Sequence, residues 1–181
     1  MLVFDMKIQD TLIPDVKIIQ PSVYDDNRGF FLETFQKKRY QQALNINFDF
    51  VQDNHSRSAR GVLRGMHFQK KNPQGKLVRA VQGEIYDVVV DIRKDSLTYG
   101  KWVSANLSET NKFQLWVPPG LAHGFLVLSE SADVEYKCTA EYEANYQMSL
   151  LWNDPDVGII WQTDSPLLSE KDQQGVLLKN I

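Results

Sequence analysis

The chain is divided into short β-favouring segments by residues that form turns, and this pattern limits the possible folds more than any other feature. Breaks of this kind lie at Gln82-Gly83, Ser96–Gly100, Ser108–Asn111 and Pro118–Gly120. Many short strands at steady spacing are typical of a β-sandwich or a β-barrel. No sustained helical period is present that would support βαβ units. The pattern therefore predicts an all-β fold.

The predicted strands cover most of the chain and leave room for only a few short helices. We expect strands at Val16–Gln20, Phe30–Phe35, Phe48–Asn54, Gly61–Gln69, Lys76–Val81, Glu84–Ile92, Lys101–Leu107, Phe113–Val117, Ala122–Leu128 and Val134–Thr139. The best helical candidate is Lys37–Leu44, and a second short helix is expected around Ser169–Gln173. Ser56–Arg60 is interpreted as a polar loop because it contains no apolar side chain larger than alanine.

Length and charge exclude several classes of protein. A length of 181 residues favours a single domain, residues 1–181, with its own hydrophobic core. The net charge of −3 gives no electrostatic reason to bind nucleic acid or an anionic membrane. No apolar run approaches membrane-spanning length, and charged residues interrupt the first ten positions, unlike a signal peptide. The one cysteine, Cys138, excludes an intrachain disulfide, so we expect a cytoplasmic protein.

The segment Gly61–Gln69 combines strand-favouring residues with three side chains suited to binding or proton transfer, Arg64, His67 and Gln69. An arginine or histidine on a buried strand needs a partner. Either the strand is half exposed with its polar side chains in water, or it runs through a pocket with His67 as the acid–base group. Strict alternation places Arg64 and His67 on opposite faces of the strand. Both can line one pocket only if the strand bends or bulges, which Gly65 permits.

Three histidines, His55, His67 and His123, limit the metal sites that the chain can build. A double-stranded β-helix of the cupin type would place His67 and His123 on neighbouring inner strands. Many such barrels bind a metal through a His-x-His pair, but the second position of that pair is Gln69 here, and glutamine is a poor ligand for transition metals. We therefore expect no metal and no other cofactor, which leaves His67 free to move protons. His55 is expected at the surface.

A histidine that acts as a base is normally oriented by a carboxylate bound to its other ring nitrogen. The sequence offers Asp87, Asp91, Asp154 and Asp172, and periodicity cannot choose among them. Asp87 and Asp91 can equally face outward on an otherwise apolar strand.

A reaction that inverts a carbon needs a second proton-transfer group on the opposite face. Tyr136 lies in the middle of a predicted strand, and alternation puts it on the same face as Val134 and Cys138. A buried tyrosine with a satisfied hydroxyl is the more common case. Lys76 opens a strand after a glycine turn, where its ammonium group either stabilises an enolate oxygen or is solvated.

Many of these residues belong to a series of motifs, and the match to one known family runs from about Ile13 to Asp172. The motifs are Gln52-Asp-Asn-His-Ser56, Gly61-Val-Leu-Arg-Gly-Met-His-Phe-Gln69, Gly75-Lys-Leu-Val78, Gly83-Glu-Ile-Tyr-Asp-Val88, Val90-Asp-Ile-Arg93, Pro118-Pro-Gly-Leu-Ala-His-Gly-Phe125 and Leu168-Ser-Glu-Lys-Asp172. In this order they resemble the dTDP-4-dehydrorhamnose 3,5-epimerases. The resemblance implies a homodimeric, cupin-type jelly roll that needs no metal and inverts C3 and C5 of a dTDP-4-keto-6-deoxyhexose.

The resemblance also implies a role for each site residue. His67 would be the base, Asp172 its orienting carboxylate, Tyr136 the acid on the opposite face, and Lys76 would lie near the C4 oxygen. The substrate-binding residues would be Arg28, Glu33, Gln52, Asn54, Arg64, His123, Tyr142, Gln147 and Lys171. Arg28 and Glu33 would reach the site from the partner subunit, and Tyr142 would stack on the base. Residues 1–25 would include a strand at the dimer contact, and residues 153–181 would form a tail that contributes to the site.

The chain departs from the family's pattern after the tyrosine, where the usual proline and glutamate are Ala144 and Gln147. Because a glutamine amide donates as well as accepts hydrogen bonds, the nucleotide preference is left open. The rival functions are an epimerase that inverts only one carbon, an epimerase of a different nucleotide-4-keto sugar, and a non-catalytic sugar-binding cupin. The joint presence of His67 and Tyr136 counts against the last of these.

Overall fold

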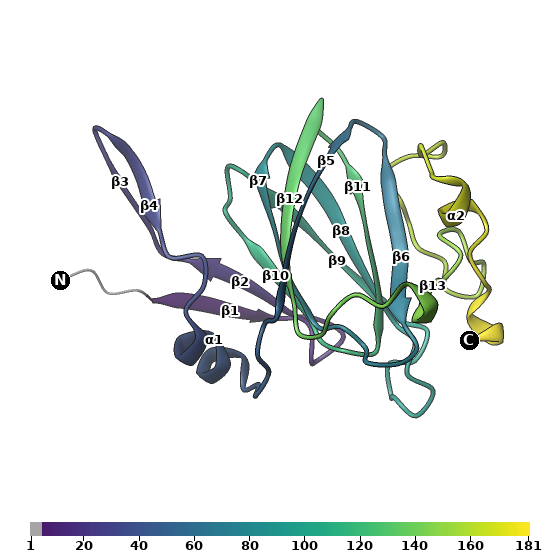
Figure 1. The fold of residues 1–181 in the computed structure, drawn as a ribbon. Helices are drawn as coiled ribbons and strands as arrows, with labels where there is room; N and C mark the ends of the chain where they lie inside the picture. Colours follow the sequence, from purple (N-terminus) through teal and green to yellow (C-terminus); the bar gives the residue numbers. More distant parts are fainter. Residues whose placement is uncertain (1–4) are drawn as a thin grey trace.

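Two antiparallel sheets face each other in the computed structural model, which describes residues 5–181 (Figure 1). The six-stranded sheet has the order β1 (Met6–Asp10), β2 (Lys17–Pro21), β10 (Gln114–Val117), β7 (Lys76–Gln82), β12 (Ser131–Cys138) and β5 (Gln52–Ala59). The five-stranded sheet has the order β13 (Gln147–Ser149), β6 (Leu63–Gln69), β11 (Leu121–Val127), β8 (Glu84–Asp91) and β9 (Trp102–Ser108). The predicted all-β class with a few short helices is confirmed.

The main hydrophobic core lies between the facing sheets. Val78 and Val134 from the six-stranded sheet pack in one cluster with Val89, Phe125 and Val127 from the five-stranded sheet, and all five are buried. Successive side chains of a strand point to opposite faces, so alternate residues of the central strands enter this core. Other inward positions of the two sheets carry polar side chains, which line a cavity.

A second apolar layer covers the outer face of the five-stranded sheet. Leu63 and Met66 of β6 pack there with Val157 and Leu178 of the C-terminal segment. The backbone N–H of Leu178 donates a hydrogen bond to the buried carboxylate of Asp154 at 2.6 Å. The C-terminal segment is therefore fixed to the sheet by both apolar and polar contacts.

The C-terminal segment carries α2 (Glu170–Gln173) to the side of β6, as Figure 1 shows in yellow. The backbone N–H of Leu63 donates to the carbonyl of Leu167 at 2.9 Å. This hydrogen bond ties the segment that leads into α2 to β6. Ser169 caps the helix, because its Oγ accepts a hydrogen bond from the backbone N–H of Asp172 at 3.2 Å. The helix predicted around Ser169–Gln173 is confirmed. A 3₁₀ turn, η2, follows at Leu178–Asn180, and another, η1, precedes β13 at Ala144–Tyr146.

The helix α1 (Lys37–Leu44) has the bounds that the sequence predicted. The side chain of Gln36 accepts a hydrogen bond from the backbone N–H of Arg39 at 2.7 Å, which satisfies a donor of the first turn. Asn45 ends the helix in a left-handed conformation with a φ of 53°. Tyr40 is buried in the cluster that covers the outer face of the six-stranded sheet.

The position of β5 differs from the prediction. The strand runs from Gln52 to Ala59, so the predicted strand Phe48–Asn54 is placed too early and the predicted loop Ser56–Arg60 is mostly strand. The side chains that share a face with the inward residues of β12 are polar, and they are Gln52, Asn54, Ser56 and Ser58. An apolar pattern could not locate a strand whose inner face is polar. β1, β3 (Val23–Asp26) and β13 were also not predicted.

A hairpin of β3 (Val23–Asp26) and β4 (Gly29–Leu32) extends beyond both sheets (Figure 1). Phe30 and Phe31 are 54% and 55% exposed on it. The expected dimer-contact segment 1–25 comprises β1, β2 and part of β3, and its residues 1–4 lie outside the described part of the chain. Among residues 5–181, no helix is long and apolar enough to cross a membrane.

Candidate active site

A bulge in β6 brings Arg64 and His67 to the same face of the five-stranded sheet. Their partners on β11 show that the register shifts by one residue between them. Gly65 permits this shift, because its φ is +146° and an added Cβ would lie 2.6 Å from the Cα of Gly124. Arg64 consequently points toward β5, where its Nε donates to Ser58 Oγ at 2.9 Å.

His67 and Asp172 form a hydrogen-bonded pair, with Nε2 of the histidine 2.6 Å from Oδ1 of the carboxylate. Burial alone would raise the pKa of Asp172, but hydrogen bonds from His67, Ser169 and the backbone of Gly65 outweigh burial and hold the pKa below its ordinary 3.8. The carboxylate is therefore ionised at neutral pH and favours a proton on Nε2, which leaves Nδ1 available as a base. Asp172 is thus the one of the four candidate aspartates that is hydrogen-bonded to His67.

The other three aspartates have different partners. Asp87 accepts hydrogen bonds from His123 Nε2, which lies 2.8 and 3.0 Å from its two oxygens. Asp91 binds the guanidinium of Arg93, and Asp154 holds the C-terminal segment. Asp87 and Asp91 are fully buried, so the interpretation that they face outward on their strand is wrong. The reason is that β8 is covered on both faces, by the facing sheet and by the C-terminal segment.

Tyr136 and Lys76 belong to the facing six-stranded sheet. On the inner face of that sheet, Tyr136 lies opposite Asn54, and Lys76 lies opposite Cys138. Burial, and next the field of Cys138, raises the pKa of Tyr136 above its ordinary 10.0, so the hydroxyl keeps its proton at neutral pH. Burial lowers the pKa of Lys76 from its ordinary 10.5, against the opposing fields of Cys138 and Asp87.

A cavity of about 280 Å³ is lined by residues of both sheets. Its lining residues are Gln52, Asn54, His67, Phe68, Gln69, Gln74, Lys76, Tyr136, Tyr142 and Gln147. His67 and Tyr136 therefore face one space from opposite sheets. Phe68 and Gln74 were not predicted as site residues. Phe68 has no polar group and Gln74 lies in a turn, so no signal in the sequence marked either one.

Predicted binding residues from four segments meet beside this cavity. Tyr142 Oη donates to Gln147 Oε1 at 2.5 Å, and Lys171 Nζ donates to the same oxygen at 2.8 Å. The backbone N–H of Tyr142 donates to Gln52 Oε1 at 2.8 Å, and Gln52 Nε2 donates to Asn54 Oδ1 at 3.0 Å. These contacts join the loop after β12 to β5, β13 and α2.

Arg28 and Glu33 are not brought to this cavity within their own chain. Arg28 lies at the turn of the β3–β4 hairpin with its side chain 85% exposed, and it is bonded to Asp26. Glu33 follows the hairpin and forms an ion pair with Arg39.

Among the predicted residues that do not line the cavity, Asp172 and Lys171 bond to residues that line it, and His123 pairs with His67 on the neighbouring strand. Arg64 bonds to Ser58, which does not line the cavity.

The side chain of Gln69 anchors a loop. Its Nε2 donates to the carbonyl oxygens of Asn72 and Glu141 at 2.9 and 3.3 Å, and its Oε1 accepts from the backbone N–H of Glu143 at 2.7 Å. Within residues 5–181, no three side chains of His, Cys, Asp or Glu are grouped so that they could hold a metal ion. His55 is 53% exposed, which confirms its expected surface position.

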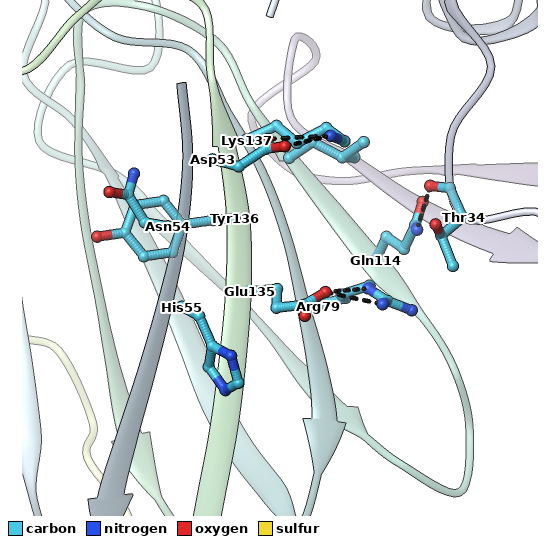
Figure 2. A pocket seen from close by; sticks show the side chains of 10 residues that line it. Thr34, Asp53, Asn54, His55, Arg79, Gln114, Glu135, Tyr136 and Lys137 are labelled. Carbon is cyan, nitrogen blue, oxygen red and sulfur yellow. Dashed lines mark hydrogen bonds and ion pairs between the residues drawn. The ribbon is translucent and has the colours of Figure 1, made fainter. Parts of the chain in front are cut away.

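A second cavity of about 270 Å³ involves the outer face of the six-stranded sheet (Figure 2). The ion pairs Lys137–Asp53 and Arg79–Glu135 line it, with N–O distances of 2.9 and 2.8 Å. Tyr136 lies on the other side of β12 from these pairs (Figure 2). Because its charged side chains are paired with each other, this cavity is less suited to acid–base chemistry than the first one.

Comparisons with known proteins show the family of the chain. A sequence profile described as dTDP-4-dehydrorhamnose 3,5-epimerase matches residues 10–180. The chain belongs to this family of epimerases. It is 52% identical over 171 residues to the dTDP-4-dehydrorhamnose 3,5-epimerase of Pseudomonas aeruginosa, with 94% of each chain covered. It is also 52% identical to the Neisseria gonorrhoeae protein of the same name, but spans only 52% of that protein's length.

Solved structures of related epimerases share the fold. The dTDP-6-deoxy-D-glucose-3,5-epimerase of Legionella pneumophila, in complex with dTDP-4-keto-L-rhamnose, matches with a TM-score of 0.96 and 50% identity, covering 98% of this chain and 95% of that one. ChmJ, a 3'-monoepimerase from Streptomyces bikiniensis in complex with dTDP-quinovose, matches with a TM-score of 0.88 and 33% identity, covering 94% and 87%. The predicted cupin-type jelly roll of the dTDP-4-dehydrorhamnose 3,5-epimerase family is confirmed.

Proposed function

We propose that the chain is a cofactor-independent epimerase that inverts C3 and C5 of dTDP-4-dehydro-6-deoxy-D-glucose to give dTDP-4-dehydro-L-rhamnose. The observation that carries this proposal is the position of the His67–Asp172 pair and of Tyr136 on opposite sheets across one cavity. A carbon inverts when a proton leaves one face and another returns to the opposite face. Membership of the family supports the substrate class.

In the proposed mechanism, His67 removes the proton from a carbon next to the C4 ketone. Its Nδ1 is the available nitrogen, because Nε2 faces Asp172. The electron pair of the broken C–H bond delocalises onto the ketone oxygen, and protonated Lys76 stabilises the resulting enolate. Tyr136 then gives its proton to the opposite face of the same carbon. His67 then releases its proton to solvent and Tyr136 takes one up from solvent, which restores both groups. Because the ketone acidifies both flanking carbons, the restored side chains act at C3 and at C5.

The remaining residues bind the substrate in this proposal. The set is Gln52, Asn54, Arg64, His123, Tyr142, Gln147 and Lys171. Arg64 suits the diphosphate because a guanidinium donates two hydrogen bonds at once. Tyr142 is 50% exposed, and it stacks on the base. His123 lies opposite His67 on the neighbouring strand, beside the sugar.

The nearest alternative is an epimerase that inverts only one of the two carbons. The structural similarity to a 3'-monoepimerase supports this alternative. An epimerase of a different nucleotide-4-keto sugar would use the same catalytic residues. A non-catalytic sugar-binding protein has no need for both a His67–Asp172 pair and a facing Tyr136, which argues against that function.

Incubation with dTDP-4-keto-6-deoxyglucose in deuterated water tests the proposal. Mass spectrometry counts the incorporated deuterium atoms, and NMR assigns them to C3 or C5 and reports the configuration. We expect one deuterium at each carbon with both configurations inverted. Inversion at one carbon would identify a mono-epimerase, and the absence of any exchange would leave a sugar-binding protein.

We also propose a homodimer in which each subunit completes the site of the other. Arg28 and Glu33 lie around a projecting hairpin, outside the cavity of their own chain, which supports this arrangement. An isolated two-stranded hairpin is also only marginally stable in water, so contact with a second copy would stabilise it.

Mixing two inactive variants, Arg28→Ala and His67→Ala, should restore part of the activity when subunits exchange. One site of the mixed dimer then contains both Arg28 and His67. Two preparations of His67→Ala mixed together serve as the control and should stay inactive. A fully active monomer in light scattering would contradict the shared site.

Catalysis should survive the removal of divalent metals. The reason is that Gln69 binds a loop and that residues 5–181 bring no metal-binding group of side chains together. Dialysis against EDTA followed by the epimerase assay checks this expectation. Activity that is lost with the chelator and returns only with an added divalent metal would refute it.

A cytoplasmic location is part of the same proposal. The thiol of Cys138 is buried and free, which fits a reducing compartment. Cell fractionation followed by immunodetection tests this location, and recovery in a secreted fraction would contradict it.

A further inference from the structure

Two donors converge on one oxygen atom beside the catalytic cavity. Gln147 Oε1 accepts from Tyr142 Oη at 2.5 Å and from Lys171 Nζ at 2.8 Å. A carbonyl oxygen has two lone pairs, and both are used here. Rotating the amide by half a turn would point its NH₂ group at the two donors. The orientation of Gln147 is therefore fixed, with Oε1 toward Tyr142 and Lys171.

Lys171 is consequently held by a neutral group rather than by a carboxylate. No ion pair among residues 5–181 includes it. The adjacent Asp172 is bonded to His67, and Glu143 of the facing loop is bonded to Asn72 at 2.6 Å. The charge of Lys171 is therefore not cancelled, although the ammonium group has a defined position.

Gln147, which lines the cavity, and Lys171, which is bonded to it, supply a positive charge and several donors at this side of the site. The ammonium group of Lys171 has three N–H bonds and uses one on Gln147, so two can still donate. Nε2 of Gln147 donates to no described residue, and its side chain lines the cavity. This arrangement is complementary to an anion with many acceptor oxygens. In a nucleotide sugar that part is the diphosphate, because the sugar and the base are uncharged.

We propose that Gln147 sets the affinity for the diphosphate by holding Lys171 in place without cancelling its charge. The identity of the ligand rests on the proposed function. A carboxylate at position 147 would form an ion pair with Lys171 and would place a negative charge beside the phosphates. Charges a few ångströms apart at a partly exposed site change binding by roughly tenfold, and added salt screens the effect.

Titrations with dTDP and with thymidine test the inference. Gln147→Glu should weaken dTDP binding about tenfold at low ionic strength, and added salt should reduce the difference. Thymidine has no phosphate and should bind both proteins equally, which also shows that the variant is folded. Gln147→Met has a similar length but removes the acceptor that holds Lys171 and adds no charge, so it should weaken dTDP binding by about threefold, which is less than the effect of Gln147→Glu. Gln162→Glu makes the same change at an exposed position outside the cavity and should have no effect.

The possible outcomes separate this inference from the proposed function. If the wild type binds dTDP but Gln147→Glu binds it equally well, the inference is wrong and the proposed function stands. Equal weakening by methionine and glutamate, or equal weakening for thymidine and dTDP, would also overturn it, because amide contacts rather than charge would then matter. If the wild type binds neither dTDP nor thymidine, the proposed function itself fails.

Discussion

His67→Ala should abolish both the exchange of substrate protons with deuterated water and the inversion of the sugar. A positioned acid–base group contributes about 10²–10⁴-fold to a rate. The loss should reach the top of this range, because the neighbouring His123 is bonded to Asp87 and cannot easily replace the base. His55→Ala, which removes an exposed histidine, is the matched control and should keep the wild-type rate.

Tyr136→Phe should separate exchange from inversion. Phenylalanine keeps the ring and its packing but has no hydroxyl to donate a proton, so the fold should tolerate the change. His67 can still remove the proton and return a deuteron to the same face. The expected result is continued deuterium exchange with retained configuration and little inverted product, measured by NMR and mass spectrometry.

Asp172→Asn should slow exchange as well, because an amide favours a different tautomer and orientation of His67. Exchange that is lost or slowed in the His67 and Asp172 variants but continues in Tyr136→Phe distinguishes the base and its orienting group from the group that returns the proton. Inversion by Tyr136→Phe at the wild-type rate, or deuterium exchange by His67→Ala at that rate, would show that the assignment of the two roles is wrong.

Lys76→Met should lower kcat by about 10²–10³-fold and change KM little. The ammonium group is needed for the enolate, whose negative charge develops only after the proton has left. Methionine has a similar length, and it suits a position that is only 8% exposed. A variant that raises KM with an unchanged kcat would place Lys76 in substrate binding instead.

The charge of Lys76 also predicts an alkaline limit to activity. Burial lowers the pKa of Lys76 below 10.5, and the fields of Cys138 and Asp87 oppose this. Because only the protonated form stabilises the enolate, kcat should fall as the pH rises through the lowered pKa. Asp87→Asn removes a negative charge that raises this pKa, so the limit should move to lower pH. The limit should persist for deuterium exchange by Tyr136→Phe, which assigns it to Lys76.

Local properties of the sequence determined the class of the fold and most of its elements. Alternation, turn residues and the break before Lys76 predicted the central strands, and α1 was predicted with both of its bounds. These features depend on residues close together in the chain, whose propensities act without the rest of the molecule. The ordered motifs were also sufficient to identify the family, because they are distributed over nearly the whole chain as far as Asp172. The residue types of His67 and Tyr136 were sufficient to suggest an acid–base pair.

The tertiary structure alone decided which of these side chains meet. Pattern left four aspartates as possible partners of His67, and the one that binds it lies 105 residues along the chain, brought there by packing of the C-terminal segment. The bulge at Gly65 decided that Arg64 shares the face of His67, since it depends on the close approach of a second strand. β5 was misplaced because its inward side chains are polar, and two of them, Gln52 and Asn54, line the cavity rather than the core. Each of these results depends on contacts between segments that are distant in the chain, and local periodicity cannot predict such contacts.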